Sequence, residues 1–228
     1  MSPRRREAPP GPTEAARLAD DLRDRILSGE LAAGTPLREQ SLALSTGLSR
    51  HTVRTALARL TTERLVVQEP YRGIRVTSFT AEDVKALQQL RCALEAEAVR
   101  LTRERHGRTW PDEVTAPVEK AMIELENVAR SHPDDWPVVA AAHAAVHRAI
   151  VATAGSPRIQ DAYARLDSEM LLLLVNLRPT YSAEEVVNDH RAYLHQVQAD
   201  GEAAVRNHLD HGTRQIWPRS ARSIDAEA

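Results

Sequence analysis

The segment from Ser49 to Leu60 constrains the fold more than any other part of this 228-residue sequence. It carries three arginines and a histidine but no acidic residue. Its apolar residues recur at the spacing of one helical face, namely Val53, Ala56, Leu57 and Leu60. Such a helix buries its apolar face and leaves its basic face open to an anion. We therefore expect a short packed helix whose exposed side is positively charged.

The residues before this basic segment predict two further helices. Thr13 is a good N-cap and begins a helix that ends near Gly29, with an apolar stripe of Leu18, Leu22 and Ile26. A turn at residues 34–36 separates it from a short helix over 38–46, which Gly47 ends. The basic helix then follows after a connection of only a few residues.

The residues after the basic segment predict a β-hairpin, because apolar runs over 65–67 and 74–76 flank a tip that contains Gly73. Two helices around a glycine turn, followed by a hairpin, form a winged helix-turn-helix. In that fold Ser49 to Thr52 lie at the end of the helix that enters the major groove of DNA. The alternative is an ordinary small helix with a solvated basic face.

Beyond Phe79 the pattern changes to long helices only, which predicts an all-α helical bundle of about six helices. The fold class is therefore mainly α, a winged helix-turn-helix with a small hairpin wing followed by the bundle. We expect a flexible tail over 1–12, a DNA-binding domain over 13–79 and an all-helical domain over 80–228. The expected bundle helices begin at Thr80 and cover 111–131, 136–154, 157–177, 183–198 and 201–222.

Composition excludes several classes of protein. Hydrophobic residues make up 42% of the chain and charged residues 27%, which disfavours global disorder. No apolar run approaches the roughly 20 residues that a membrane span needs, and the first residues do not resemble a signal peptide, so we expect a cytoplasmic protein without membrane contact. The one cysteine, Cys92, excludes a disulfide framework and a four-thiolate zinc site, so imidazoles and carboxylates would have to hold any metal.

Charge is distributed unevenly along the chain. Residues 1–79 contain 13 arginines and nine acids, whereas residues 80–228 contain 17 basic residues and 23 acids. The front of the chain therefore has an excess of four positive charges and the remainder an excess of six negative charges. This distribution favours an anion-binding module fused to a domain with another role.

Eight of the nine histidines lie in the predicted bundle. His143 and His147 share one face of a helix, His190 lies within an apolar stripe, and His208 and His211 lie on the last helix. Imidazoles that converge from several helices can form a buried divalent site that prefers Zn²⁺ or a similar metal. The alternative is a set of hydrogen-bonded structural histidines. A metal-dependent hydrolase is disfavoured because no His-Glu-x-x-His stretch is present.

Arg91 lies on the core side of its predicted helix, with Glu95 one turn further on. An inward arginine must be paired, and this spacing favours a structural ion pair. The alternative is a guanidinium fork that binds the carboxylate of an effector.

The N-terminal segment resembles the DNA-binding domain of the GntR transcription regulators, and the remainder resembles the FadR-type C-terminal domain, or FCD. The motifs in register are Ile26-x-x-Gly29, Gly34-x-x-Leu37-x-Glu39, Gly47-x-Ser49-Arg50, Val53-Arg54-x-Ala56-Leu57, Arg91-x-x-Leu94-Glu95 and Val146-His147 through Gly155. The resemblance implies that residues 80–228 form an effector-binding and dimerisation domain, and that the homodimer binds a pseudo-palindromic double-stranded DNA operator. The DNA-binding residues that it implies are Arg38, Gln40, Ser49, Arg50, His51, Thr52, Arg54 and Gly73.

In the bundle the resemblance implies a metal site of the type Asp-x-x-x-His plus one histidine from each of the last two helices. His147 and His190 match this pattern, and His143 stands in place of the aspartate, which shifts the preference toward Zn²⁺ or Ni²⁺. For the last ligand, helix phase favours His208, whereas the axial level along the helix favours His211. We expect His211, because an axial mismatch of about one turn, ~5 Å, is harder to absorb than a rotation of the ring.

The resemblance implies a ligand-responsive transcriptional regulator. We expect a repressor, because repression is the more common activity in the family. Its expected effector is a small organic acid that completes the metal shell and meets Arg91. Two alternatives remain at this point. One is a metal-free regulator that responds to a larger or acyl-type effector, and the other is the metal-dependent hydrolase.

Overall fold

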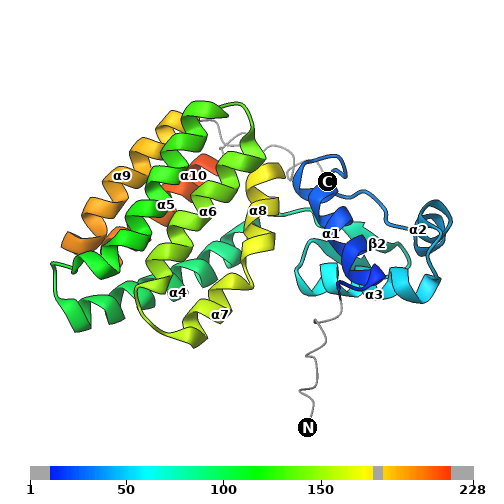
Figure 1. The fold of residues 1–228 in the computed structure, drawn as a ribbon, viewed down its shortest axis with the longest axis horizontal. Helices are drawn as coiled ribbons and strands as arrows, with labels where there is room; N and C mark the ends of the chain where they lie inside the picture. The colour runs from blue at the N-terminus through cyan, green and yellow to red at the C-terminus, as the bar shows by residue number, and fades with distance from the viewer. Residues whose placement is uncertain (1–10, 177–181, 217–228) are drawn as a thin grey trace, which may run out of the picture.

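The computed structural model describes residues 11–176 and 182–216, and it confirms the predicted fold class (Figure 1). A winged helix-turn-helix precedes a bundle that is wholly helical in its described residues. Most of the expected N-terminal tail and the expected end of the last helix near residue 222 lie outside the described residues. None of the described helices is both long and apolar enough to cross a lipid bilayer.

The winged helix-turn-helix is held by caps and by one apolar core. Its elements are α1 (Glu14–Leu27), α2 (Glu39–Thr46), α3 (Arg50–Thr62), β1 (Val66–Glu69) and β2 (Gly73–Val76). As predicted, the Thr13 hydroxyl accepts from a backbone amide of α1. The Ser49 hydroxyl accepts in the same way at the start of α3. The apolar stripes of α1 and α3 pack together and are buried, and both strands add to this core.

The wing is an antiparallel pair in which Val66 lies opposite Val76 and Glu69 lies opposite Gly73. Tyr71 and Gly73 at its tip both have positive φ, at 62° and 76°. Glycine tolerates that conformation without strain, whereas the fully exposed Tyr71 does not.

The bundle consists of α4 (Ala81–His106), α5 (Asp112–Ser131), α6 (Trp136–Ala152), α7 (Pro157–Ala164), α8 (Asp167–Asn176), α9 (Ala183–Asp200) and α10 (Glu202–Ile216). Helix α4 packs against α6, α7 and α10, and α9 packs against α5 and α10. Capping boxes begin two of these helices, Thr80 with Asp83 at α4 and Ser182 with Glu185 at α9.

The expected single helix over 157–177 is instead two helices, α7 and α8, separated by a turn at Arg165 and Leu166. No glycine or proline marks this break, so no local signal predicts it. The turn allows the two halves to pack on different neighbours. Tyr163 of α7 faces the interior near α4, while α8 packs against both α6 and α1.

Helix α8 belongs to the cores of both domains. Figure 1 shows α8 on the side of the bundle that faces the winged helix. Its Leu172 is fully buried within the apolar core of the winged helix-turn-helix. Leu173 and Leu174, the next two residues, are buried in the bundle instead. The two domains are therefore joined through packed side chains as well as through the connecting chain.

Candidate metal centre and DNA-binding face

Three imidazoles meet inside the bundle. His143 and His147 come from successive turns of α6, and His190 comes from α9. The Nε2 atom of His147 lies 3.2 Å from Nε2 of His143 and 3.0 Å from Nε2 of His190. Nitrogen ligands about 2.0–2.1 Å from a tetrahedral ion are themselves about 3.3 Å apart. The three rings therefore have the spacing of metal ligands.

The other ring nitrogens show which tautomers are present. Nδ1 of His147 lies 2.8 Å from a carboxylate oxygen of Glu95, and Nδ1 of His190 lies 2.7 Å from the carbonyl oxygen of Val186. Both partners are acceptors, so each Nδ1 must carry a hydrogen. In a neutral ring the Nε2 atom then bears a lone pair. Two such lone pairs face each other across 3.0 Å, an arrangement that a cation bound to both nitrogens would stabilise.

Burial keeps these rings neutral. His147 and His190 are 1% and 2% exposed. Burial is the main cause that lowers the pKa of His190 to about 4 and holds the pKa values of His143 and His147 well below their usual range. Protonation of a ring at neutral pH is thus disfavoured, and neutral imidazoles are the form that coordinates a metal.

The structure places His208, not His211, against this cluster. The ring centre of His208 is 4.6 Å from that of His190 and 5.3 Å from that of His147. His211 is 53% exposed, and its Nε2 atom lies 3.5 Å from a carboxylate oxygen of Asp189. Helix phase, which favoured His208, explains this contact, because His208 neighbours the buried Leu209 on the inner face of α10. The expected ligand His211 lies at the exposed edge of a small cavity that His143, His190 and His208 also line.

A buried polar network surrounds the histidines. Glu95 of α4 is completely buried and accepts hydrogen bonds from His147, Tyr193 and Tyr163. Arg91 is buried as well, and its Nε atom donates to the Tyr163 hydroxyl at 3.1 Å and lies 3.7 Å from Glu95. Arg91 therefore makes the structural ion pair that its spacing favoured.

Two small cavities, of about 20 and 10 Å³, adjoin the cluster. Arg91, His143 and Leu174 line both of them. Each cavity has room for about one water molecule, so only a small group fits beside the histidines without rearrangement.

The residues predicted to bind DNA lie at the start of α2, at the start of α3 and at the start of β2 in the wing. Most are exposed and Thr52 is half-buried; the set is Arg38, Gln40, Ser49, Arg50, His51, Thr52, Arg54 and Gly73. The Ser49 hydroxyl accepts from the Thr52 amide and lies 2.9 Å from the Thr52 hydroxyl, so these two side chains also hold the start of α3. A groove of about 500 Å³ separates α2 and α3 from the wing.

Arg54 does not project freely from α3. Its Nε and Nη2 atoms donate to the two carboxylate oxygens of Glu39, at 3.2 and 2.9 Å. The Arg54 guanidinium lowers the pKa of Glu39, which keeps the carboxylate ionised. Glu39 is the first residue of α2, so this pair connects the two helices of the helix-turn-helix motif.

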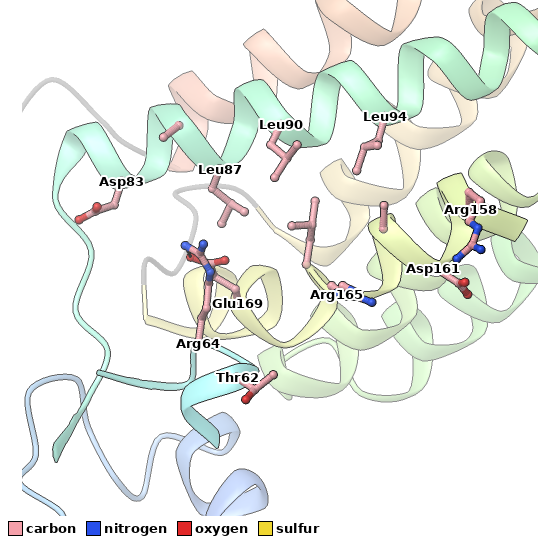
Figure 2. Close-up of a pocket in the computed structure, with 13 residues that line it drawn as sticks. Thr62, Arg64, Asp83, Leu87, Leu90, Leu94, Arg158, Asp161, Arg165 and Glu169 are labelled. Atoms are coloured by element: carbon pink, nitrogen blue, oxygen red, sulfur yellow. Dashed lines mark ion pairs between the residues drawn. The ribbon is translucent and has the colours of Figure 1, made fainter. Parts of the chain in front are cut away.

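A larger cavity of about 690 Å³ lies where the two domains meet. Figure 2 shows Leu87, Leu90 and Leu94 of α4 pointing into it, opposite Arg165 and α8. On the winged-helix side, Arg64 follows α3 and lies 3.6 Å from the nearly buried carboxylate of Glu169. This cavity was not expected from the sequence, because residues from four helices and a loop form it.

Sequence reasoning also missed the roles of Tyr163 and Tyr193, and it treated Glu95 only as a partner of Arg91. Glu95 lies on the inward face of α4, which was a signal that its carboxylate required several partners. The tyrosines are 68 and 98 residues away from Glu95 in the sequence. Nothing in their local sequence marks that contact.

Comparisons with known proteins agree with this architecture. Residues 14–76 match the family model for bacterial regulatory proteins of the gntR family, and residues 86–212 match that for the FCD domain. The chain is 26% identical over 211 residues to a protein of Paenarthrobacter nicotinovorans described as a "Probable D-xylose utilization operon transcriptional repressor", covering 92% of this chain and 90% of that protein. It is 29% identical over 170 residues to the HTH-type transcriptional repressor GlaR of Escherichia coli K12, covering 74% and 76%.

Solved structures show the same fold. E. coli McbR/YncC superimposes with a TM-score of 0.63 at 20% identity, covering 90% of this chain and 95% of that chain. A GntR structure from Rhodococcus sp. RHA1 gives a TM-score of 0.71 at 24% identity, covering 89% and 96%.

Proposed function

Because this chain belongs to the GntR family of bacterial regulatory proteins, in the branch with an FCD domain, we propose that it is a metal-dependent, effector-responsive repressor. Membership makes it a DNA-binding transcriptional regulator and not an enzyme, which removes the hydrolase alternative. Repression is the activity named for two of its relatives. The proposal concerns the metal, the effector and the direction of regulation.

In this proposal α3 enters the major groove of the operator. Arg50 and Arg54 supply affinity and base reading, with Ser49, His51 and Thr52 beside them. Arg38 and Gln40 approach the backbone from the start of α2, and Gly73 lets the wing approach the minor groove. A homodimer would present two such faces to a pseudo-palindromic site.

The observation that carries the metal proposal is the pair of opposed lone pairs on His147 and His190. His143 adds a third nitrogen donor, and His208 is the fourth imidazole in contact. An all-nitrogen set favours Zn²⁺ or Ni²⁺ over metals that prefer oxygen. A bound ion would supply a Lewis acid to which the carboxylate of an effector can bind.

A small organic acid is the effector that best fits this centre. The adjoining cavities are small, and Arg91 lines both of them, which supports a compact anion. Such a ligand would control DNA binding by favouring one arrangement of the two domains, since a ligand shifts only states that it binds unequally. Helix α8 supplies a packed connection, because Leu174 lines both cavities while Leu172 lies in the winged-helix core.

The cavity at the domain junction favours a second candidate, the metal-free regulator of a larger or acyl-type effector. Its volume of about 690 Å³ suits a drug-sized molecule, and leucines of α4 line one side (Figure 2). A ligand there would touch both domains directly.

Metal content of tag-free protein, measured by elemental mass spectrometry, separates the two candidates. We expect close to one Zn²⁺ or Ni²⁺ per chain in the wild type and its loss in His147→Ala. A matched pair on α10 tests the fourth ligand: His208→Ala should weaken binding, whereas His211→Ala should not. Protein without metal that still releases DNA with a long-chain acid would favour the second candidate.

A further inference from the structure

We propose that Glu95 is a positioning residue of the metal centre, which holds His147 and His208 in the orientation that binds the ion. This inference rests on the proposed metal site and concerns a carboxylate that does not itself reach the ion. Glu95 is 0% exposed, and a buried carboxylate is strongly disfavoured unless its oxygens are hydrogen-bonded. The hydrogen-bond partners of Glu95 therefore show which side chains its carboxylate positions.

The two oxygens of Glu95 have different partners. Oε1 accepts from Nδ1 of His147 at 2.8 Å and from the Tyr193 hydroxyl at 2.7 Å. Oε2 accepts from the Tyr163 hydroxyl at 3.0 Å and lies 3.7 Å from Nε of Arg91. Oε1 is thus the oxygen on the metal side, and Oε2 connects the carboxylate to Arg91 and α7.

The contact with His147 fixes one tautomer. Because Oε1 accepts the hydrogen on Nδ1, the Nε2 atom of His147 keeps its lone pair, and this atom lies 3.2 Å from Nε2 of His143 and 3.0 Å from Nε2 of His190. A negative carboxylate behind the ring also makes Nε2 a stronger donor toward a cation. Neutral imidazoles alone would leave the charge of a divalent ion uncompensated in the core.

The contact with Tyr193 extends the effect to a second ring. Tyr193 donates its hydroxyl hydrogen to Oε1 and stacks on His208, with ring centres 4.1 Å apart and an angle of 5° between the planes. Both Tyr193 and Glu95 are almost completely buried, so neither side chain has room to move away. One carboxylate on α4 thereby sets the positions of rings on α6 and α10.

The test compares Glu95→Gln with wild type, and Tyr193→Phe with Tyr163→Phe as a matched pair. Zn²⁺ affinity is measured by competition with a chromophoric chelator, and the absorption spectrum of bound Co²⁺ reports the geometry around the ion. We expect about 10- to 100-fold weaker Zn²⁺ binding and an altered Co²⁺ spectrum in Glu95→Gln. Tyr193→Phe, which loses the partner of Oε1, should shift both readouts more than Tyr163→Phe, which loses a partner of Oε2.

The outcomes distinguish failure of the Glu95 inference from failure of the proposed metal centre. Wild-type affinity and an unchanged Co²⁺ spectrum in Glu95→Gln would overturn the role of Glu95 and leave the metal centre standing. Failure of the wild type to bind either ion would overturn the metal centre and this inference together. If Glu95→Gln does not fold, as judged by circular dichroism, the tyrosine pair decides: equal effects of the two variants would refute the inference.

Discussion

Substitution of Leu172 by alanine should destabilise the winged helix-turn-helix, although this residue belongs to a bundle helix. Leu172 is 0% exposed and lies in the core that α1 and α3 form. A fully buried Leu→Ala change costs about 3–5 kcal/mol, because the lost contacts leave a cavity. A loss of even about 3 kcal/mol lowers the ratio of folded to unfolded winged helix-turn-helix roughly 150-fold.

The assay uses the placement of the tryptophans. Trp110 and Trp136 are buried in the bundle, and none of the three tryptophans lies in the winged helix-turn-helix, so tryptophan fluorescence does not report that domain, while circular dichroism at 222 nm reports every helix. In urea, Leu172→Ala should lose ellipticity at lower denaturant concentration than wild type, ahead of the fluorescence change. Leu44→Ala, at a leucine that is 78% exposed on α2, is the control and should stay within about 0.5 kcal/mol of wild type. Coincident, unshifted transitions in Leu172→Ala would refute the shared core.

Three further predictions concern the operator, the metal and pH. Alanine at Arg50 or Arg54 should weaken binding to a selected operator roughly 10- to 100-fold in fluorescence anisotropy, and unchanged affinity in both variants would remove α3 from the DNA interface. Stripping the metal with a chelator should lower the melting temperature of the wild type, by an amount equivalent to about 2.7 kcal/mol at a metal concentration 100 times the Kd, and should not change that of His147→Ala. Acidification should destabilise the metal-free protein, because the pKa of His190 is about 4 in the folded chain against 6.5 in the unfolded chain. Between these values the unfolded state binds a proton that the folded state does not, so the free energy of unfolding falls as pH drops from 6.5 toward 4. Urea midpoints at pH 7.5 and 5.5 measure this, and His190→Gln should show a smaller difference.

Local patterns predicted the parts of the fold that depend on neighbouring residues. The stripe of α3 and the cap of α1 at Thr13 both follow from residues within a few positions of each other. The position of His143 and His147 on one face of the same helix follows from helix periodicity in the same way. These features are fixed before any long-range packing is known.

The features that could not be predicted depend on how distant segments meet. The choice between His208 and His211 required the rotation of α10 after the turn at Gly201, which packing against α4 and α9 sets. The partners of Glu95 come from three other helices, and no periodicity links them. The break between α7 and α8 likewise serves contacts with both domains.

The ion pair between Glu39 and Arg54 affects how the protein would search a genome. Any phosphate or guanine that Arg54 engages must compete with a carboxylate that already occupies two of its donor atoms. Random DNA, which offers only phosphates, gains little from that exchange, whereas a site that also offers correctly placed base edges gains more. If Arg54 contacts DNA as proposed, this pair would therefore lower the affinity that Arg54 adds on unrelated sequence, where phosphates are its only partners, more than it lowers that affinity at the operator.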